Sequence, residues 1–163
     1  MLSLTVFDIE RFKAINDTFG HRAGDEVLRT IARRLRAAVG DINRVARLGG
    51  NMFAVMRAAI HDASDAARVL DEAADEVVGR PIQVEGREIR VTAKAGIALF
   101  PDDGADADAL FRNAEASLKR AKETGDRFLF YTPHINARVA EQVDLENRLR
   151  RAVERRELFF HFQ

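Results

Sequence analysis

Polar residues that could bind a small molecule follow the first apolar run of the chain and continue to residue 25. A lysine ammonium can neutralise a phosphate, an amide can donate and accept hydrogen bonds, and a carboxylate accepts them. Helix ends and turns explain the same residue types, and the spacing alone favours that structural interpretation. The residues are Asp8, Lys13, Asn16, Asp17, His21 and Asp25.

A pair of glycines stands between two runs of alternating residues. Gly49 and Gly50 in this setting are typical of a tight β-hairpin turn. The next two residues are Asn51 and Met52. An amide offers only a neutral oxygen and a thioether is a poor ligand for Mg²⁺, which prefers hard, mostly charged oxygens. The turn therefore supplies neither a charged metal ligand nor a general base.

Hydrophobic periodicity predicts the elements that must hold these residues in place. The expected helices cover residues 10–19, 23–39, 63–78 and 107–122. The expected strands cover residues 2–8, both sides of the glycine turn, a hairpin over 82–89, one long strand over 89–99, and 127–131. This order predicts an α+β fold, with a central, mostly antiparallel sheet flanked by helices that pack mainly on one face.

Together, these motifs resemble the GGDEF family of diguanylate cyclases, which condense two GTP molecules into cyclic di-GMP. The resemblance covers about residues 2–131 and lacks the first helix of the family's domain. It implies the ferredoxin-like palm of nucleotide cyclases. In the family the two positions after the paired glycines are acidic, whereas here they are Asn51 and Met52. The resemblance therefore implies a degenerate domain without a catalytic residue, because roughly two negative charges and the presumed base are lost.

The resemblance also assigns binding roles. Asp8 and the backbone carbonyl of Ile9 match Mg²⁺ ligands, so we expect Mg²⁺ binding that is weak or lost. Asn16 and Asp25 match the residues that contact the guanine edge, which favours GTP as a ligand over the purely structural interpretation. The predicted nucleotide-binding residues are Phe12, Lys13, Asn16, Asp25, Gly49, Gly50 and Lys122.

One phosphate-binding position departs from the family pattern. The arginine that usually follows the glycine after Lys122 is Asp126 here. An acid at this place would repel a triphosphate. Arg127, one position further along the chain, is the candidate to take the role of that arginine. The sequence therefore leaves the GTP affinity of this domain open.

A domain boundary is expected at Pro133. Residues 1–132 would form the degenerate GGDEF domain, and residues 133–163 a linker helix followed by a strand. The segments 146–152 and 157–163 look like the opening of an EAL phosphodiesterase domain. We therefore expect an adjoining EAL domain and an upstream sensor domain as partners.

Composition excludes several other classes of function. Basic and acidic residues balance at 26 each, and no basic-aromatic patch is evident, so a nucleic-acid partner is not expected. No apolar run approaches the roughly 20 residues of a membrane span, so direct membrane insertion is not expected either. The chain has no cysteine, which is compatible with a reducing compartment, and we expect a cytoplasmic location.

Three functions remain open at this point. The first is a catalytically inactive regulatory domain that binds GTP and modulates the EAL domain. The second is a nucleotide-free platform for protein interaction or homodimerisation. The third is a weakly active diguanylate cyclase. GTP binding separates the first from the second, and formation of cyclic di-GMP would establish the third.

Overall fold

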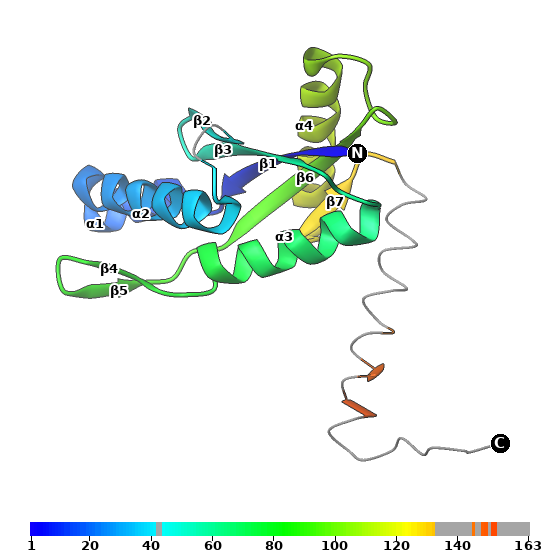
Figure 1. Ribbon diagram of the computed structural model, residues 1–163. Helices are drawn as coiled ribbons and strands as arrows, with labels where there is room; N and C mark the ends of the chain where they lie inside the picture. Colours follow the sequence, from blue (N-terminus) through cyan, green and yellow to red (C-terminus); the bar gives the residue numbers. More distant parts are fainter. Residues whose placement is uncertain (42–43, 133–144, 146–147, 150, 153–163) are drawn as a thin grey trace.

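The computed structural model describes residues 1–41 and 44–132, together with residues 145, 148–149 and 151–152. Within these residues a five-stranded sheet is the centre of the fold, in the strand order β2-β3-β1-β6-β7 (Figure 1). The elements in chain order are β1 (Leu2–Ile9), α1 (Phe12–Phe19), α2 (His21–Val39), β2 (Val45–Gly49), β3 (Met52–Ala58), α3 (Ala63–Val77), β4 (Ile82–Val84), β5 (Arg87–Ile89), β6 (Ala93–Phe100), α4 (Ala107–Thr124) and β7 (Phe128–Phe130).

Strand β1 lies in the middle of this sheet. It pairs in antiparallel fashion with β3 on one side and with β6 on the other, while β7 runs parallel to β6. Val6, Phe7 and Ile9 are all buried, so consecutive residues of β1 are apolar on both faces, as expected for a central strand. The predicted α+β fold with a mostly antiparallel central sheet is therefore confirmed.

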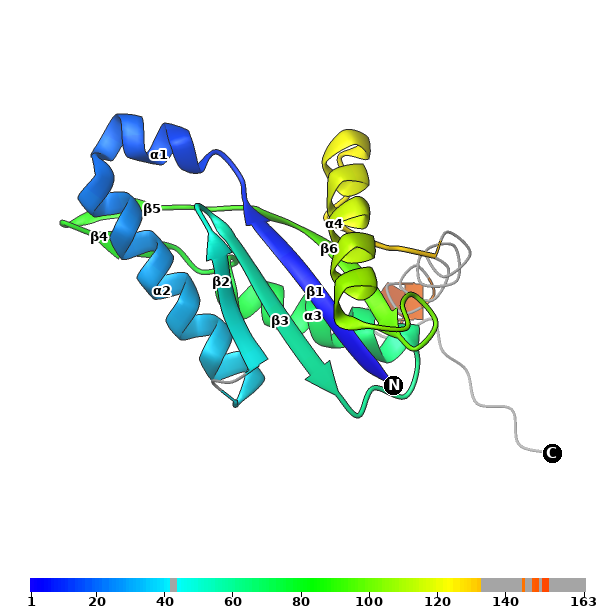
Figure 2. The same ribbon diagram turned by 90° about the horizontal axis from the view of Figure 1, so that it is seen from above.

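Helices cover both faces of the sheet, which corrects the expectation that they pack mainly on one. Helix α4 packs across β1 and β6 against Val6 and Ala98 (Figure 2). On the other face, Phe7 and Phe53 belong to a separate cluster with residues of α2 and α3. Because β1 and β6 are apolar on both faces, each face needs a helical cover to exclude water.

The predicted continuous strand over residues 89–99 is wrong. Strand β5 ends at Ile89 and β6 begins at Ala93, so β4 and β5 form a small two-stranded sheet of their own. In Figure 1 this hairpin lies below α1 and α2, and Ile82, Val84 and Ile89 belong to the same buried cluster as residues of α2. The alternation of apolar residues continues through this break, because Ile89 and Val91 are both buried. The backbone between Ile89 and Ala93 nevertheless belongs to neither strand. In the break, the Thr92 carbonyl accepts a hydrogen bond from the Glu10 amide at 2.8 Å.

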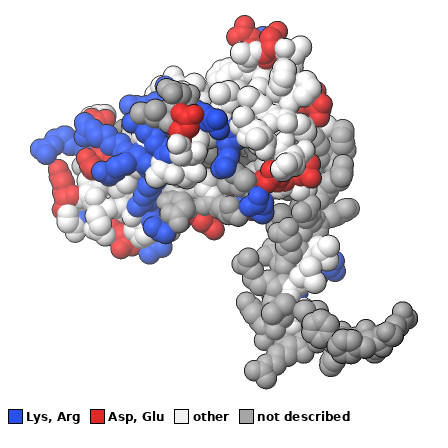
Figure 3. Space-filling model, viewed as in Figure 1, with Lys and Arg blue, Asp and Glu red and all other residues white. Residues whose placement is uncertain are grey.

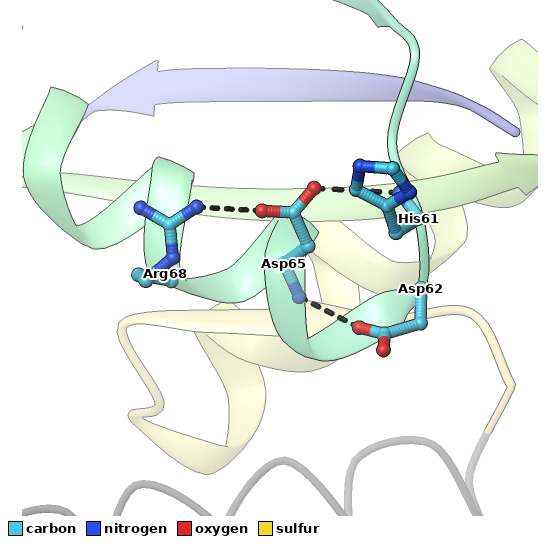
Figure 4. A network of polar contacts seen from close by, with 4 residues as sticks. All are labelled: His61, Asp62, Asp65 and Arg68. Carbon is cyan, nitrogen blue, oxygen red and sulfur yellow. Dashed lines mark hydrogen bonds and ion pairs between the residues drawn. The ribbon is translucent and has the colours of Figure 1, made fainter.

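Helix α3 begins at a polar cap far from the sheet centre. The Asp62 side chain accepts a hydrogen bond from the Asp65 amide at 2.8 Å, which satisfies a donor of the first helical turn. The Asp65 carboxylate accepts from the His61 amide and pairs with Arg68 at 2.6 Å (Figure 4). The His61 N–H, and next the Arg68 contact, hold the pKa of Asp65 below its usual value of 3.8.

Basic side chains gather over α2 and the neighbouring β2 (Figure 3), where Arg29, Arg33, Arg36 and Arg47 are exposed. Arg34 has a structural role instead, because its guanidinium donates to the carbonyls of Val77, Arg80 and Pro81 and so ties α2 to the end of α3.

Among the described residues, no helix is both long enough and apolar enough to cross a membrane. Of the predicted linker helix, Leu145 and Leu149 are helical and exposed. Val143, Val153 and the predicted strand over 158–163 lie outside the described residues.

Candidate functional site

Four elements meet where β1 ends. Asp8, near the end of β1, stands directly opposite Met52 of β3 and opposite Lys94 of β6 in the two antiparallel ladders. Directly opposite residues lie on the same face of a sheet, here the face covered by α4. The C-terminal end of α4, yellow in Figure 2, brings Lys122 to Asp8. We call this group, with Asn51, the β1-end site.

Asp8 has a partner on each of its carboxylate oxygens. Oδ2 lies 2.7 Å from Nζ of Lys122, and Oδ1 accepts a hydrogen bond from Nδ2 of Asn51 at 3.1 Å. The Asp8 side chain is only 13% exposed, whereas that of Lys122 is 43% exposed. The carboxylate is therefore held inside the site by two internal donors.

Asn51 directs its amide nitrogen at both predicted metal-binding groups. Nδ2 donates to the Ile9 carbonyl at 2.6 Å as well as to Asp8. Both partners are acceptors, so the amide nitrogen faces them and the amide oxygen does not. The glycine turn makes this possible, because Gly49 and Gly50 have φ angles of 138° and 51°, which side-chain-bearing residues rarely adopt.

This donor set does not suit Mg²⁺. The cation binds hard oxygens in octahedral geometry, but here an amide N–H lies between the Asp8 carboxylate and the Ile9 carbonyl. Lys122 pairs with the other carboxylate oxygen, and Met52 offers only a thioether. Over the described part of the chain, no three acidic or histidine side chains gather as a metal site.

Lys94 belongs to the β1-end site, and the sequence interpretation missed it. Its ammonium donates to the carbonyl of Gly125, the residue that ends α4 in a left-handed conformation. A detectable signal was present, because Lys94 is the one charged residue in a strand of small and apolar side chains. A charge at such a place has to be explained by a partner or a function.

Of the two predicted guanine-binding residues, Asn16 lies on a second surface, where α1 packs on α2. Oδ1 of Asn16 lies 1.9 Å from the place where a Cβ on Gly24 would be, and Cζ of Phe12 lies 3.1 Å from it. Only a glycine therefore leaves room for the Asn16 amide here. We call Phe12, Asn16 and Gly24 the α1–α2 contact.

Asp25 follows Gly24 directly and is exposed. It lines an open cavity of about 410 Å³ between α2 and the β4–β5 hairpin, together with Arg22, Arg29 and Glu85. Lys13 is exposed on α1. The structure thus brings Asn16 next to the residue before Asp25, and it places Lys122 with Asp8 at the other predicted group.

Arg127 does not take the place of the missing arginine beside Lys122. It pairs with Asp71 at 3.2 Å and with Asp75 at 2.8 Å, both on α3. Burial raises the pKa of Asp71, although Arg127 acts in the opposite direction. Asp126 accepts a hydrogen bond from the Thr124 hydroxyl at the end of α4.

Comparison with known proteins agrees with this architecture. The profile described as "Diguanylate cyclase, GGDEF domain" matches residues 1–128. The chain therefore belongs to the GGDEF family.

Among similar proteins is MucR of Pseudomonas aeruginosa, named a bifunctional diguanylate cyclase/cyclic di-GMP phosphodiesterase. It is 38% identical over 157 residues, which are 96% of this chain and 23% of the relative. NbdA of the same species, named a cyclic di-GMP phosphodiesterase, is 31% identical over 163 residues, 99% of this chain and 21% of the relative. The chain thus spans roughly a fifth to a quarter of the length of these relatives.

Solved structures show the same fold. An EAL/GGDEF domain protein from M. capsulatus has a TM-score of 0.72 at 34% identity, covering 81% of this chain and 85% of that chain. A sensory box/GGDEF family protein from Caulobacter crescentus has a TM-score of 0.71 at 38% identity, covering 76% of this chain and 79% of that chain.

Proposed function

We propose that this domain is a catalytically inactive regulatory module of cyclic di-GMP signalling. It binds GTP and modulates the activity of an adjoining EAL phosphodiesterase domain. The names of MucR and NbdA include cyclic di-GMP phosphodiesterase, and one structural relative is an EAL/GGDEF domain protein. These relatives support the signalling context, and the residues of the two surfaces support the division between binding and catalysis.

The observation that carries the proposal is the amide of Asn51 at Asp8 and Ile9. Condensing two GTP molecules needs a 3′-hydroxyl to lose a proton as it attacks an α-phosphate, and the charge that develops must be neutralised. Neither Asn51 nor Met52 can accept that proton at neutral pH. With these two side chains after the glycine turn, Asp8 is the one carboxylate left at the β1-end site for this step, and it already pairs with Lys122 and Asn51.

GTP recognition is supported by the α1–α2 contact. An asparagine amide can donate and accept, so Asn16 suits a guanine edge, and the Asp25 carboxylate suits the guanine N1–H and N2–H₂ donors. Gly24 leaves the space that the Asn16 amide occupies. Lys13 and Lys122 carry the positive charge that a triphosphate needs.

Calorimetric titration of GTP into the protein tests this proposal, with Asn16→Ala as the variant and Thr18→Ala, at an exposed position on the same helix, as the matched control. Saturable binding that is weakened at least about tenfold by Asn16→Ala, or about 1.4 kcal/mol, supports a guanine site. An absence of binding by folded protein, with and without Mg²⁺, refutes it and favours the nucleotide-free interaction platform. That alternative draws on Asp126, an acid near the expected phosphates.

Two further measurements address catalysis and regulation. Incubation with GTP should yield no cyclic di-GMP, and product formation that disappears in Asp8→Ala would instead establish a weak cyclase. In the full-length protein, GTP should change the rate of cyclic di-GMP hydrolysis, and Asn16→Ala should remove that change. A hydrolysis rate that ignores GTP would contradict the regulatory role.

A further inference from the structure

The β1-end site carries more positive than negative charge among its described side chains. The one carboxylate among the residues that define the site, Asp8, already pairs with Lys122, and the neighbouring acid Asp126, outside this group, accepts a hydrogen bond from the Thr124 hydroxyl. The backbone of Lys94 stands opposite Asp8 in the sheet, and its ammonium, which donates to the Gly125 carbonyl at the end of α4, adds a second positive charge. Acids at positions 51 and 52 would reverse this balance, which would then suit a cation. With Asn51 and Met52 in these positions, the balance suits an anion.

The Asn51 amide contacts the two oxygen atoms that the resemblance assigns to a bound cation. Its Nδ2 lies 3.1 Å from Oδ1 of Asp8 and 2.6 Å from the Ile9 carbonyl oxygen. The partial positive charge of the amide N–H groups stabilises these two acceptors side by side. Both oxygens thereby have a hydrogen-bond donor, while the negative charge of Asp8 is offset by the ammonium of Lys122.

We infer that this site binds the phosphates of a nucleotide without a divalent cation. Lys94 and Lys122 supply the positive charge, and Asn51 holds Asp8 and the Ile9 carbonyl in the place of the cation. The inference rests on the proposed function in taking GTP as the nucleotide, and it adds the metal independence and the role of Lys94.

The two lysines are able to take a phosphate without losing their present partners. An ammonium has three N–H donors, of which the contact with Asp8 uses one on Lys122. The Lys122 side chain is 43% exposed, so an anion can reach it from solvent. The ammonium of Lys94 is likewise in an exposed contact with Gly125.

A purely structural role for the lysines makes a different prediction. Cations near the C-terminal end of a helix are stabilised by its dipole, and both lysines lie at that end of α4. If that were their whole role, removing Lys94 would lower stability and leave anion binding unchanged.

The decisive experiment titrates GTP and, separately, inorganic triphosphate into the wild-type protein by calorimetry, in excess EDTA and in excess Mg²⁺. The expected result is binding of both anions in EDTA, with dissociation constants for GTP that differ by no more than about twofold between the two conditions. An absence of binding of both anions in EDTA overturns the inference.

Variants separate the contributions. Asn51→Asp combined with Met52→Glu should make GTP binding at least about tenfold weaker in EDTA than in Mg²⁺. Lys94→Met should weaken triphosphate binding in EDTA about fivefold or more, while Lys119→Met, an exposed lysine on the same helix, should not. Triphosphate binding that Lys94→Met leaves unchanged would overturn the assigned role of Lys94.

The outcomes also distinguish this inference from the proposed function. GTP binding that requires Mg²⁺ and is lost in Asn16→Ala would overturn the inference and leave the proposed GTP site intact. Triphosphate binding in EDTA without any added affinity for GTP, and without an effect of Asn16→Ala, would support the inference and refute guanine recognition.

Discussion

The β1-end site and the α1–α2 contact differ in what has changed relative to the GGDEF pattern. At the β1-end site Asp8 stands opposite Met52 and the glycine turn is formed, while the two side chains after the turn are an amide and a thioether, where the resemblance implies acids. At the α1–α2 contact the side chains match the pattern, and Gly24 still makes room for Asn16. In this fold, the backbone position of a site residue is thus independent of the chemistry of its side chain.

The separation has a physical reason. Strand pairing and the burial of Phe7, Phe53 and Val6 hold the end of β1 in place, and burying one such side chain contributes about 1.5–3 kcal/mol. The side chains at positions 51 and 52 are half-buried and contribute less. They can therefore change without loss of the fold, and any change in function follows from their charge and donors.

The largest expected effect comes from separating α4 from the sheet. A Cβ on Gly96 would lie 2.1 Å from the Ala114 carbonyl oxygen and 2.2 Å from the Leu118 nitrogen, both backbone atoms of α4. Gly96→Ala should lower the free energy of unfolding by about 3 kcal/mol or more, as measured by urea denaturation. Because α4 carries Lys122, this variant should disturb the β1-end site and spare the α1–α2 contact.

The control for this variant is Ala116→Ser, at an exposed position on α4, which should change stability by less than about 0.5 kcal/mol. If Gly96→Ala were as stable as the wild type, the close approach of β6 and α4 would not be a requirement of the fold.

A second variant acts on the α1–α2 contact alone. A Cβ on Gly24 would lie 1.9 Å from Oδ1 of Asn16, and the flexible side chain can move away at little cost to the fold. Gly24→Ala should therefore retain its unfolding free energy to within about 1 kcal/mol and lose GTP affinity about tenfold, or 1.4 kcal/mol. Urea denaturation measures the free energy of unfolding, and calorimetry measures the GTP affinity.

The matched test of Gly24→Ala is a double-mutant cycle with Asn16→Ala. In the Asn16→Ala background, the added methyl group has no amide to displace and should not weaken GTP binding further. Additive losses would show that Gly24 acts on the nucleotide in another way.

A smaller effect is expected at the β1-end site itself. Asp8→Ala removes the acceptor shared by Lys122 and Asn51. Because Lys122 is 43% exposed, the pair should contribute only about 1 kcal/mol to stability. Urea denaturation of the wild type, Asp8→Ala, Lys122→Ala and the double variant gives the coupling energy between the two side chains. This energy should be of that size at low salt and should fall at high salt. Zero coupling at low salt would contradict the pairing.

The smallest effect serves as a control for both regions. The pKa of Asp65 is lowered below 3.8 by the His61 amide and by Arg68, so its carboxylate stabilises the folded state above about pH 4, and this contribution is lost as the pH falls through the folded-state pKa. Asp65→Asn should slightly lower Tm near neutral pH, and the difference should close below about pH 4. GTP binding should be unchanged, and a changed affinity would mean that the cap of α3 communicates with the nucleotide.

Much of the local structure could be predicted from the sequence. The helices, the glycine turn and the central strand follow from periodicity and turn residues, which depend on near neighbours in the chain. The break between β5 and β6 was missed, because Ile89 and Val91 keep the alternation while the backbone leaves the strand. The packing of helices on both faces of the sheet was missed as well. It depends on how the helices dock onto the sheet, which the sequence of a single helix does not reveal.

For the site, the sequence by itself determined which chemical groups are present: Asp8, the glycine turn, and an amide and a thioether directly after that turn. Only the tertiary structure decided their partners. The Asn51 amide reaches Asp8 across 43 positions of the chain, Lys94 and Lys122 join Asp8 from β6 and α4, and Arg127 pairs with α3. Such contacts depend on strand register and helix docking, which no short stretch of sequence encodes.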